Sequence, residues 1–224
     1  MVRWHRAGFR LFMDGGVCSA EFDAGTVVTL TATPDCGLLL HGYDESKSAP
    51  WANKTTGLSS DVWGEGLGWY AILIADVFDW LPADHPSRPT LMGILQKIVA
   101  GLKANQDAKT GRWCQVVDKC SEPGNWNESS GTGMFLYLIK RAIDKGYIDA
   151  AEYCPVVERA YKGLVETARD NNGRVSISPC SSISILNNTQ AYYNSAKENS
   201  PPSCLSSLLA GTWSVEQPGP VSAP

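Results

Sequence analysis

The feature that most constrains the fold is a weak repeat of glycine turns along the chain. Gly37, Gly111 and Gly173 each follow an aspartate and precede a short extended apolar run, and they stand 74 and 62 positions apart. Between the turns, apolar residues recur at the three-to-four spacing of an amphipathic helix. This pattern predicts helices over about 62–80, 89–105, 130–145 and 155–170. Each repeat is therefore expected to form a helical hairpin, and such hairpins must stack or close into a ring to bury their apolar faces.

The two ends of the chain lack this helical period. Within the first 34 residues there is one apolar cluster, and a β-branched run at 26–33 predicts at most a strand. From residue 176 onward serine, asparagine and proline dominate the sequence. We therefore expect 1–175 to form the helical domain, and 176–224 to be an irregular, partly disordered tail that contributes little to the core.

Composition excludes several classes of partner. The chain has 224 residues, 43% hydrophobic content and a formal charge of -4 without a basic run, so it can bury a core but offers no electrostatic footprint for nucleic acid. No stretch approaches the roughly 20 apolar residues of a membrane span, so we expect no membrane partner. The first residues lack the apolar segment of a signal peptide. Localisation is left between the cytoplasm and, if an N-terminal segment has been lost, the cell exterior.

The cysteine pattern argues against a metal centre. None of the seven cysteines forms a Cys-x-x-Cys pair or has a histidine nearby, whereas zinc and iron–sulfur sites use such spacing. The cysteines are Cys18, Cys36, Cys114, Cys120, Cys154, Cys180 and Cys204. We interpret them as buried free thiols and expect neither a metal nor another cofactor.

The stretch from Trp63 to Trp69 reads Trp-Gly-Glu-Gly-Leu-Gly-Trp and leads into an apolar helical pattern. Glycine lacks a Cβ and indole offers a rigid apolar face, so this helix start could leave the backbone open to a flat ligand such as a sugar. The alternative is that both indoles belong to the core and the glycines are packing contacts. The third glycine is misplaced for the dinucleotide fingerprint, and no strand precedes the stretch.

Two further segments carry carboxylates that could take part in catalysis or binding. His41, Asp44 and the acid after it lie on a loop that follows a glycine turn, where side chains can reach a ligand; the alternative is a loop held by aspartate turns. Asp14 follows Leu-Phe-Met and precedes two glycines. An acid at the edge of an apolar cluster can have a raised pKa and act as a general acid, although many such aspartates are only helix caps.

Three segments together resemble the unsaturated rhamnogalacturonyl hydrolases of glycoside hydrolase family 105, which are related to the unsaturated glucuronyl hydrolases. They are Gly37-Leu-Leu-Leu-His-Gly-Tyr-Asp-Glu-Ser, Trp63-Gly-Glu-Gly-Leu-Gly-Trp-Tyr, and Gly111-Arg-Trp-Cys-Gln-Val-Val-Asp-Lys with the Gly124-Asn-Trp-Asn-Glu-Ser-Ser-Gly stretch that follows. The resemblance extends over about 37–172. It implies an all-α fold, the (α/α)6 toroid, which agrees with the hairpin repeat. It also implies oligosaccharide substrates from pectin that end in a 4,5-unsaturated galacturonate.

The resemblance implies a mechanism outside the usual scheme of two carboxylates. An aspartic acid protonates C4 of the vinyl ether, water adds at C5, and the resulting hemiketal opens to release the neighbouring sugar. Asp14, in Phe-Met-Asp-Gly, matches the family's aspartate motif and is the expected catalytic residue. His41, Asp44, Trp63, Glu65 and Trp69 are the expected substrate-binding residues.

Two departures from the family pattern change this expectation. The family motif has an arginine that recognises the uronate carboxylate and an asparagine, whereas this chain has Glu65 and Leu67 there. Replacing attraction by repulsion at about 4 Å costs several kcal/mol at an effective dielectric of ~20. Only 26 residues separate Asp14 from His41, too few for the helical pair expected there. We therefore expect an incomplete toroid from a truncated member, with an inactive carbohydrate-binding remnant or a defective gene product as the alternative.

Overall fold

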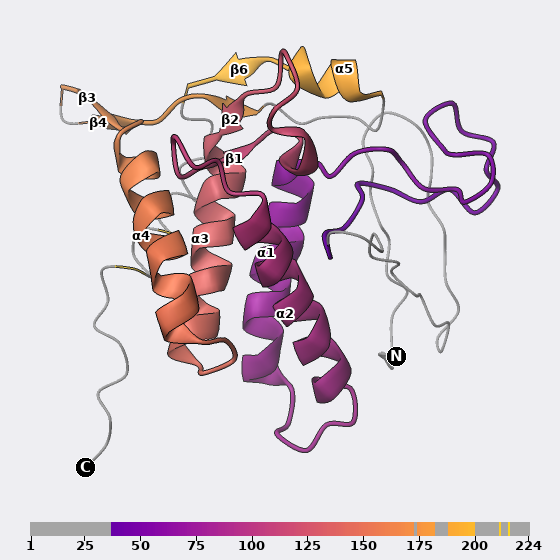
Figure 1. Cartoon of the computed structure of the whole chain (residues 1–224), viewed down its shortest axis with the longest axis vertical. Helices are drawn as coiled ribbons and strands as arrows, with labels where there is room; N and C mark the ends of the chain where they lie inside the picture. The colour runs from indigo at the N-terminus through magenta and orange to yellow at the C-terminus, as the bar shows by residue number, and fades with distance from the viewer. Residues whose placement is uncertain (1–36, 173, 182–187, 200–210, 212–214, 216–224) are drawn as a thin grey trace.

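The computed structural model describes residues 37–172, 174–181, 188–199, 211 and 215. Its helices are α1 (Gly64–Trp80), α2 (Arg88–Ala104), α3 (Ser129–Asp144), α4 (Ala150–Val165) and the short α5 (Thr189–Tyr193). The four long helices run side by side, with α1 and α2 forming one hairpin and α3 and α4 the next (Figure 1). The expected all-α architecture of helical hairpins is confirmed.

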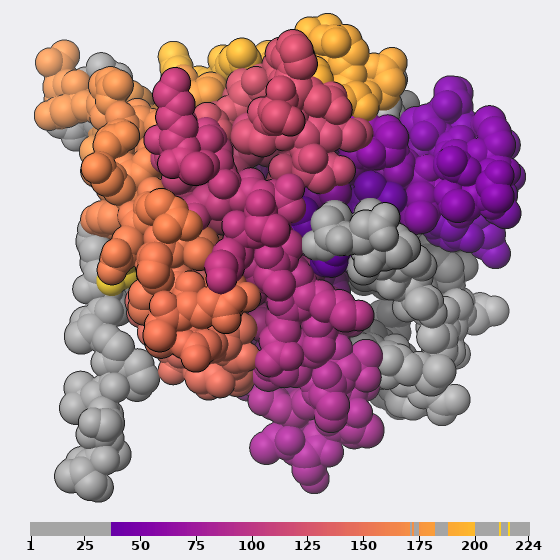
Figure 2. All heavy atoms as spheres, viewed as in Figure 1, coloured from indigo at the N-terminus to yellow at the C-terminus, as the bar shows by residue number. Residues whose placement is uncertain are grey.

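Short strands and turns lie at the end of the bundle where α1 and α3 begin (Figure 1). They form antiparallel pairs: β1 (Trp113–Cys114) with β2 (Asn127–Glu128), β3 (Arg169–Asn171) with β4 (Arg174–Ser176), and β5 (Cys180–Ser181) with β6 (Lys197–Glu198). A 3-10 turn, η1 (Val117–Lys119), follows β1. In the space-filling view, the yellow residues of the C-terminal segment lie across this same end (Figure 2). The short strands of the described residues are thus concentrated around the starts of α1 and α3.

Three of the predicted helices agree with the structure to within two residues at each end, and α4 does not. We predicted 155–170, but α4 begins at Ala150 and ends at Val165. The Asp149 side chain caps this helix by accepting hydrogen bonds from the backbone N–H groups of Ala151 and Glu152. Pro155 therefore lies inside the helix instead of starting it. A capping aspartate outweighed the proline as the signal for the helix start.

Close packing of α1 against α3 forms the centre of the core. A Cβ atom at Gly68 in α1 would lie 2.5 Å from the Met134 Sδ in α3, and one at Gly131 in α3 would lie 3.0 Å from the backbone of Gly64 in α1. The two helices can approach this closely because these positions lack side chains. Fully buried side chains from all four long helices surround this contact, among them Leu95, Ile98, Leu102, Phe135, Leu138, Ile139 and Leu164.

The two hairpins repeat the same contact between a glycine turn and the second helix of the hairpin, α2 or α4, which we call the outer helix. Gly37 and Gly111 both have a φ of +71°. A Cβ added to Gly37 would lie 2.7 Å from the Lys97 carbonyl oxygen, and one added to Gly111 would lie 2.2 Å from the Arg159 carbonyl oxygen. Lys97 and Arg159 are each the tenth residue of their helix. Four residues later each helix has a buried glycine, Gly101 or Gly163. The repeat inferred from the sequence is therefore a structural repeat at these two turns; the third turn, at residue 173, lies outside the described residues.

The described residues after 176 include short regular elements and buried side chains. Ile177 and Cys180 are fully buried, and α5 buries Tyr192 and Tyr193, which are 1% and 7% exposed. Asn188 caps α5 by accepting a hydrogen bond from the Ala191 N–H. The expectation of little contribution to the core is not met at these four buried residues, because they belong to core clusters. That the tail is irregular and partly disordered stays a prediction. The division into 1–175 and 176–224 stays a prediction.

One face of α1 is exposed and apolar. Trp69, Leu73 and Trp80 are 49%, 62% and 86% exposed, and their spacing places them on one side of the helix. The helix has 17 residues. Neither α1 nor any other helix in the described part of the chain is long and apolar enough to cross a membrane.

Candidate functional site

The residues expected to bind a ligand gather at the start of α1. The backbone of Gly64 donates a hydrogen bond to the Gln115 carbonyl oxygen over 2.8 Å, and Trp63 pairs with Val116 in an isolated bridge. These contacts fix the first turn of α1 against the turn that precedes α3. Helix starts present free N–H groups and a positive dipole end, so a polar ligand can be recognised here.

His41, Trp63 and Tyr192 form an aromatic group beside this helix start. The His41 and Trp63 rings have centroids 4.5 Å apart, and Tyr192 lies 5.8 Å from His41 and 6.4 Å from Trp63. The His41 Nδ1 and the Tyr192 hydroxyl form a hydrogen bond of 2.6 Å. The structure therefore brings together His41 and Trp63, as expected, and adds Tyr192 from α5.

His41 is neutral in the physiological range. Burial lowers the pKa of His41 to about 4, and the opposing attraction of Asp61 is the weaker effect. A neutral imidazole has one donor and one acceptor nitrogen. If Tyr192 donates to Nδ1, then Nε2 carries the proton and can donate to a ligand.

Asp61 joins three distant segments beneath this aromatic group. Its carboxylate is fully buried and accepts hydrogen bonds from the Lys119 ammonium at 2.5 Å and the Thr189 hydroxyl at 2.7 Å. Its backbone carbonyl accepts from the His41 N–H at 3.0 Å. A buried charge of this kind is stable only when it is paired and hydrogen-bonded. Asp61 thereby holds the His41 loop, η1 and α5 together.

Glu65 is a buried carboxyl group in the first turn of α1. Glu65 is 3% exposed, and its Oε2 has no hydrogen-bond partner among the described residues. Burial, together with the smaller effects of the Glu128 and Glu198 carboxylates, raises the pKa of Glu65 to about 7, against an opposing hydrogen bond from Trp69. The acid is thus poised to exchange a proton near neutral pH.

Trp63, two positions earlier, also has a buried polar atom without a partner. Its indole is 8% exposed and its Nε1 makes no hydrogen bond in the described structure. Buried polar atoms are almost always satisfied, so an unpaired one needs an explanation. Two buried polar atoms without a partner in the described structure thus lie two positions apart at the start of α1, a donor on Trp63 and the Oε2 of Glu65.

Glu128 has a different role from Glu65 although both begin a helix. Its Oε1 accepts from the backbone N–H groups of Ser130 at 2.9 Å and Ser181 at 3.0 Å, and its Oε2 accepts from the Gly131 N–H at 2.5 Å. The Ser130 hydroxyl donates to Oε1 as well. Because its oxygens are occupied, Glu128 caps α3 and ties β5 to it, and it acts on Glu65 only as a nearby negative charge.

The glycines of the Trp63–Trp69 stretch serve packing. A Cβ at Gly64 would lie 3.1 Å from the Cys114 carbonyl oxygen, and one at Gly66 would lie 2.8 Å from the Trp63 ring. Gly68 faces Met134, as described above. Of the two interpretations of this stretch, the structure supports packing contacts for the glycines. Trp69, which is 49% exposed, offers an accessible indole to a ligand.

Asp44 holds its own loop. Its Oδ1 accepts from the Ser46 N–H and hydroxyl, and its Oδ2 accepts from the N–H groups of Ser48 and Ala49 at 2.8 Å each. These hydrogen bonds, chiefly the one from Ser46, lower the pKa of Asp44 to about 2. The geometry favours the aspartate-turn interpretation of this residue, and a role in binding stays a prediction. Asp14, the expected catalytic residue, lies outside the described residues.

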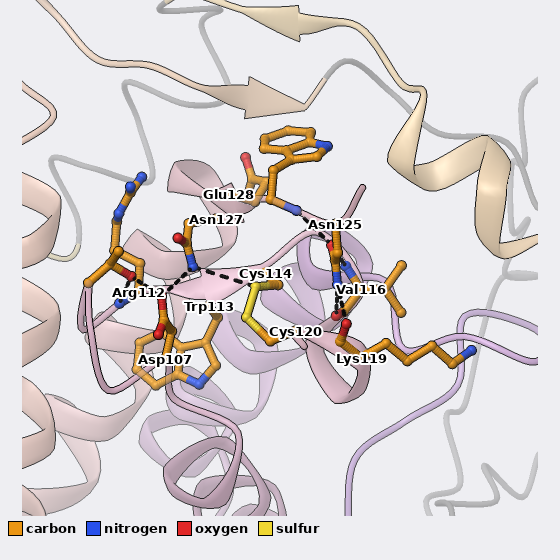
Figure 3. The surroundings of a disulfide bond; sticks show 12 residues. Asp107, Arg112, Trp113, Cys114, Val116, Lys119, Cys120, Asn125, Asn127 and Glu128 are labelled. Carbon is orange, nitrogen blue, oxygen red and sulfur yellow. Dashed lines mark hydrogen bonds between the residues drawn. A yellow bond between two sulfur atoms is a disulfide. The ribbon is translucent and has the colours of Figure 1, made fainter. Parts of the chain in front are cut away.

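The loop that supports the start of α1 is closed by a disulfide, Cys114–Cys120, with a Cα–Cα distance of 5.4 Å. Figure 3 shows this bond between Asn125, whose amide donates to the carbonyl oxygens of Val116 and Lys119, and Asn127. The interpretation of the cysteines as buried free thiols is therefore wrong here, and also for Cys154, which is free but exposed. The pairing was missed because η1 folds the chain back over six residues, which the spacing alone does not reveal.

The described residues contain no group of three or more His, Cys, Asp or Glu side chains that could hold a metal ion. The chemistry available at this site is that of carboxyl, imidazole, phenol and indole groups. Sequence reasoning missed Tyr192, Asp61 and Glu128. Only Glu128 had a local signal, because it precedes two serines at a helix start.

A scan against protein families matches the Glycosyl Hydrolase Family 88 over residues 21–212. Among curated proteins, Protein Atu3128 of Agrobacterium fabrum is 35% identical over 132 residues, which are 59% of this chain and 54% of that protein. The unsaturated 3S-rhamnoglycuronyl hydrolase of an Alteromonas species is 29% identical over 117 residues, 51% of this chain and 27% of that protein.

Solved structures give the same result. A glycoside hydrolase from family 105 of C. acetobutylicum superposes with a TM-score of 0.78 at 31% identity, covering 84% of this chain and 54% of that protein. The fold expected from the resemblance is therefore confirmed. The chain spans about half the length of the Agrobacterium and C. acetobutylicum proteins.

Proposed function

This chain belongs to Glycosyl Hydrolase Family 88, and on that premise we propose that it hydrolyses oligosaccharides that end in a 4,5-unsaturated uronyl residue, of the kind released from pectic rhamnogalacturonan. The observation that carries the proposal is the family match, which includes the His41 loop and the start of α1. The Alteromonas relative, named for an unsaturated rhamnoglycuronyl substrate, supports the same substrate class.

In the proposed reaction, Asp14 protonates C4 of the vinyl ether and water adds at C5, after which the hemiketal opens and releases the next sugar. His41, neutral and oriented by Tyr192, donates a hydrogen bond to the substrate from Nε2. The Trp63 indole N–H gains the partner that it otherwise lacks. The exposed face of Trp69 stacks on a sugar ring, because indoles provide rigid apolar surfaces.

A test of this function follows the ultraviolet absorbance of the conjugated double bond in 4,5-unsaturated digalacturonate. We expect absorbance to fall with time and Asp14→Asn to lower the rate at least ~10²-fold, as for a lost general acid. The matched control is Asp84→Asn, an exposed aspartate in the turn between α1 and α2, which should leave the rate unchanged. Near-normal turnover by the Asp14→Asn protein would remove Asp14 from the mechanism and direct attention to Glu65.

A second candidate function is carbohydrate binding without catalysis. It is favoured by Glu65 and Leu67, which stand where the resemblance implies an arginine and an asparagine. Retained binding of the oligosaccharide, with no turnover by the unaltered protein, would support this alternative.

A further inference from the structure

Glu65 combines three properties that the proposed reaction does not use. It is buried, it lies in the first turn of a long helix, and its Oε2 is unpaired among the described residues. An ionised carboxylate in this position would have a desolvated, unsatisfied oxygen, which is costly. A protonated carboxyl group avoids the charge and can donate one hydrogen bond to an acceptor brought by a ligand.

The groups around Glu65 add negative charge. Glu128, the cap of α3, and Glu198 in β6 both act on it as carboxylates. His41, beside Gly66, is neutral at physiological pH. Within the described part of the chain, no cation acts on Glu65 among its main electrostatic partners. Lys119 is paired with Asp61 at 2.5 Å, and the Arg112 guanidinium donates to the Ser129 hydroxyl at 3.4 Å, while its Nε has no partner in the described structure.

A carboxylate of a ligand that binds next to Glu65 would therefore need to share a proton with the Glu65 carboxyl group. Two adjacent carboxyl groups cannot both be ionised at a low cost, so the pair shares one proton. On the proposed function, the ligand carries a uronyl carboxylate, and the arginine that the resemblance implies at this position is replaced by Glu65.

We propose that Glu65 is a specificity-determining residue that recognises the uronyl carboxylate as a neutral acid, donating its O–H to a carboxylate oxygen, so that ligand binding takes up one proton from solvent. The inference rests on the proposed function, since it needs a uronyl ligand at the start of α1. Above neutral pH the proton must be acquired on binding. Affinity then falls about tenfold for each further pH unit, whereas below about pH 5 Glu65 already holds the proton and affinity changes little with pH.

The test is titration calorimetry of 4,5-unsaturated digalacturonate with the full chain, at about pH 8 in two buffers of different ionisation enthalpy. We expect about one proton to be taken up at pH 8, and Glu65→Gln, which can donate but not titrate, to abolish that uptake. The matched control, Glu158→Gln on the exposed face of α4, should take up the same number of protons as the unaltered protein. The comparison of two buffers gives the number of protons taken up by each protein. A contribution from Asp14 is the same in the unaltered protein and in Glu65→Gln, so it cancels when the two numbers are subtracted.

The outcomes separate this proposal from the function on which it rests. Proton uptake that disappears in Glu65→Gln supports the proposal. Binding with no proton uptake, or with uptake that persists in Glu65→Gln, overturns the proposal and leaves the proposed function standing. If the folded protein, checked by circular dichroism, fails to bind at any pH, the function is overturned and the proposal with it. A second readout does not depend on the variant folding: the affinity of the unaltered protein should fall about tenfold for each pH unit above pH 7 and level off below about pH 5, and an affinity that does not change with pH overturns the proposal.

Discussion

The hydroxyl of Tyr192 and the Nδ1 of His41 lie 2.6 Å apart although the two residues are 151 positions apart in the chain. This contact connects the loop before α1 to the short helix α5. It makes the C-terminal segment part of the candidate site, because it fixes which nitrogen of His41 faces the place where a sugar would bind.

Tyr192→Phe removes only the hydroxyl that contacts His41. We expect the free energy of unfolding to fall by about 1 kcal/mol, the usual cost of a lost hydrogen bond, while the ring of this buried residue keeps its packing. Urea denaturation followed by far-ultraviolet circular dichroism measures the change. The control is Tyr43→Phe, since Tyr43 is 60% exposed and should shift stability by less than about 0.5 kcal/mol. Equal effects of the two changes would contradict the role given to the hydrogen bond.

Glu65→Arg should strengthen binding of unsaturated digalacturonate at about pH 8. A guanidinium is always charged and pairs with a carboxylate in a bidentate fashion, so it needs no proton from solvent. We expect at least a roughly tenfold lower dissociation constant, measured by calorimetry, together with loss of the pH dependence. Equal or weaker binding by a folded variant would mean that Glu65 does not face the uronate.

The free energy of unfolding should depend on pH because of Glu65. Its pKa in the folded protein is about 7, against an ordinary value of 4.5, so the folded state holds a proton that the unfolded state releases between these values. This contribution to stability is present below about pH 4.5 and is lost as the pH rises through 7. The loss amounts to about 3 kcal/mol.

The measurement compares unfolding free energies of the unaltered protein and Glu65→Gln across this range. The unaltered protein should lose stability relative to the variant as pH rises. His41 acts in the opposite sense, because its pKa is lowered to about 4 and its contribution is lost as the pH falls below 6.5; it is common to both proteins and cancels. Parallel stability curves would show that Glu65 is ionised at neutral pH.

Two glycine substitutions in the outer helices should have effects of opposite sign. A Cβ at Gly163 in α4 would lie 1.9 Å from the Thr110 carbonyl oxygen, whereas one at Gly93 in α2 meets nothing within 4 Å. We expect Gly163→Ala to lower stability by about 1–3 kcal/mol through overpacking. Gly93→Ala should raise it by about 0.5–1 kcal/mol, since alanine favours the helix. Thermal melting of both variants tests the packing of the glycine turn, and a stable Gly163→Ala protein would contradict it.

Replacing both Cys114 and Cys120 by serine opens the small loop that supports Trp63 and Gly64. The chain-entropy model gives a loss of about 2 kcal/mol for a loop of this size. Cys180 is disulfide-bonded as well, so a dithiol reductant should lower the melting temperature of both proteins, but the fall should be smaller for the double variant than for the unaltered protein. Cys154→Ser, at a free and exposed thiol, is the control and should respond to reductant like the unaltered protein.

The long helices could be predicted because their apolar period is strong over many residues. Leu95, Ile98 and Leu102 are all fully buried in α2, as their spacing requires. The predicted bounds of α4 were displaced by five residues because the periodicity of the later residues outweighed the local signal of the Asp149 cap.

The candidate site was only partly accessible from sequence. His41, Trp63 and Glu65 could be named from the sequence because they lie in two of the three segments that carry the family resemblance. Tyr192 was not, because α5 has five residues and no period, and its burial depends on contacts with segments far away in the chain. The glycines indicated where side chains are absent but not what fills the space, which proved to be the protein's own backbone, Trp63 and Met134.

Gly37 contacts Lys97 in the same way as Gly111 contacts Arg159. This contact fixes the position of the glycine turn relative to the helices of its own hairpin. In each case the glycine turn before the first helix of a hairpin contacts the second helix of the same hairpin. The contact is therefore made within one hairpin and does not depend on its neighbours. A family built this way can vary one hairpin at a time, because a substitution outside these contacts, such as one at residue 65, leaves the contact between the glycine turn and the helix unchanged.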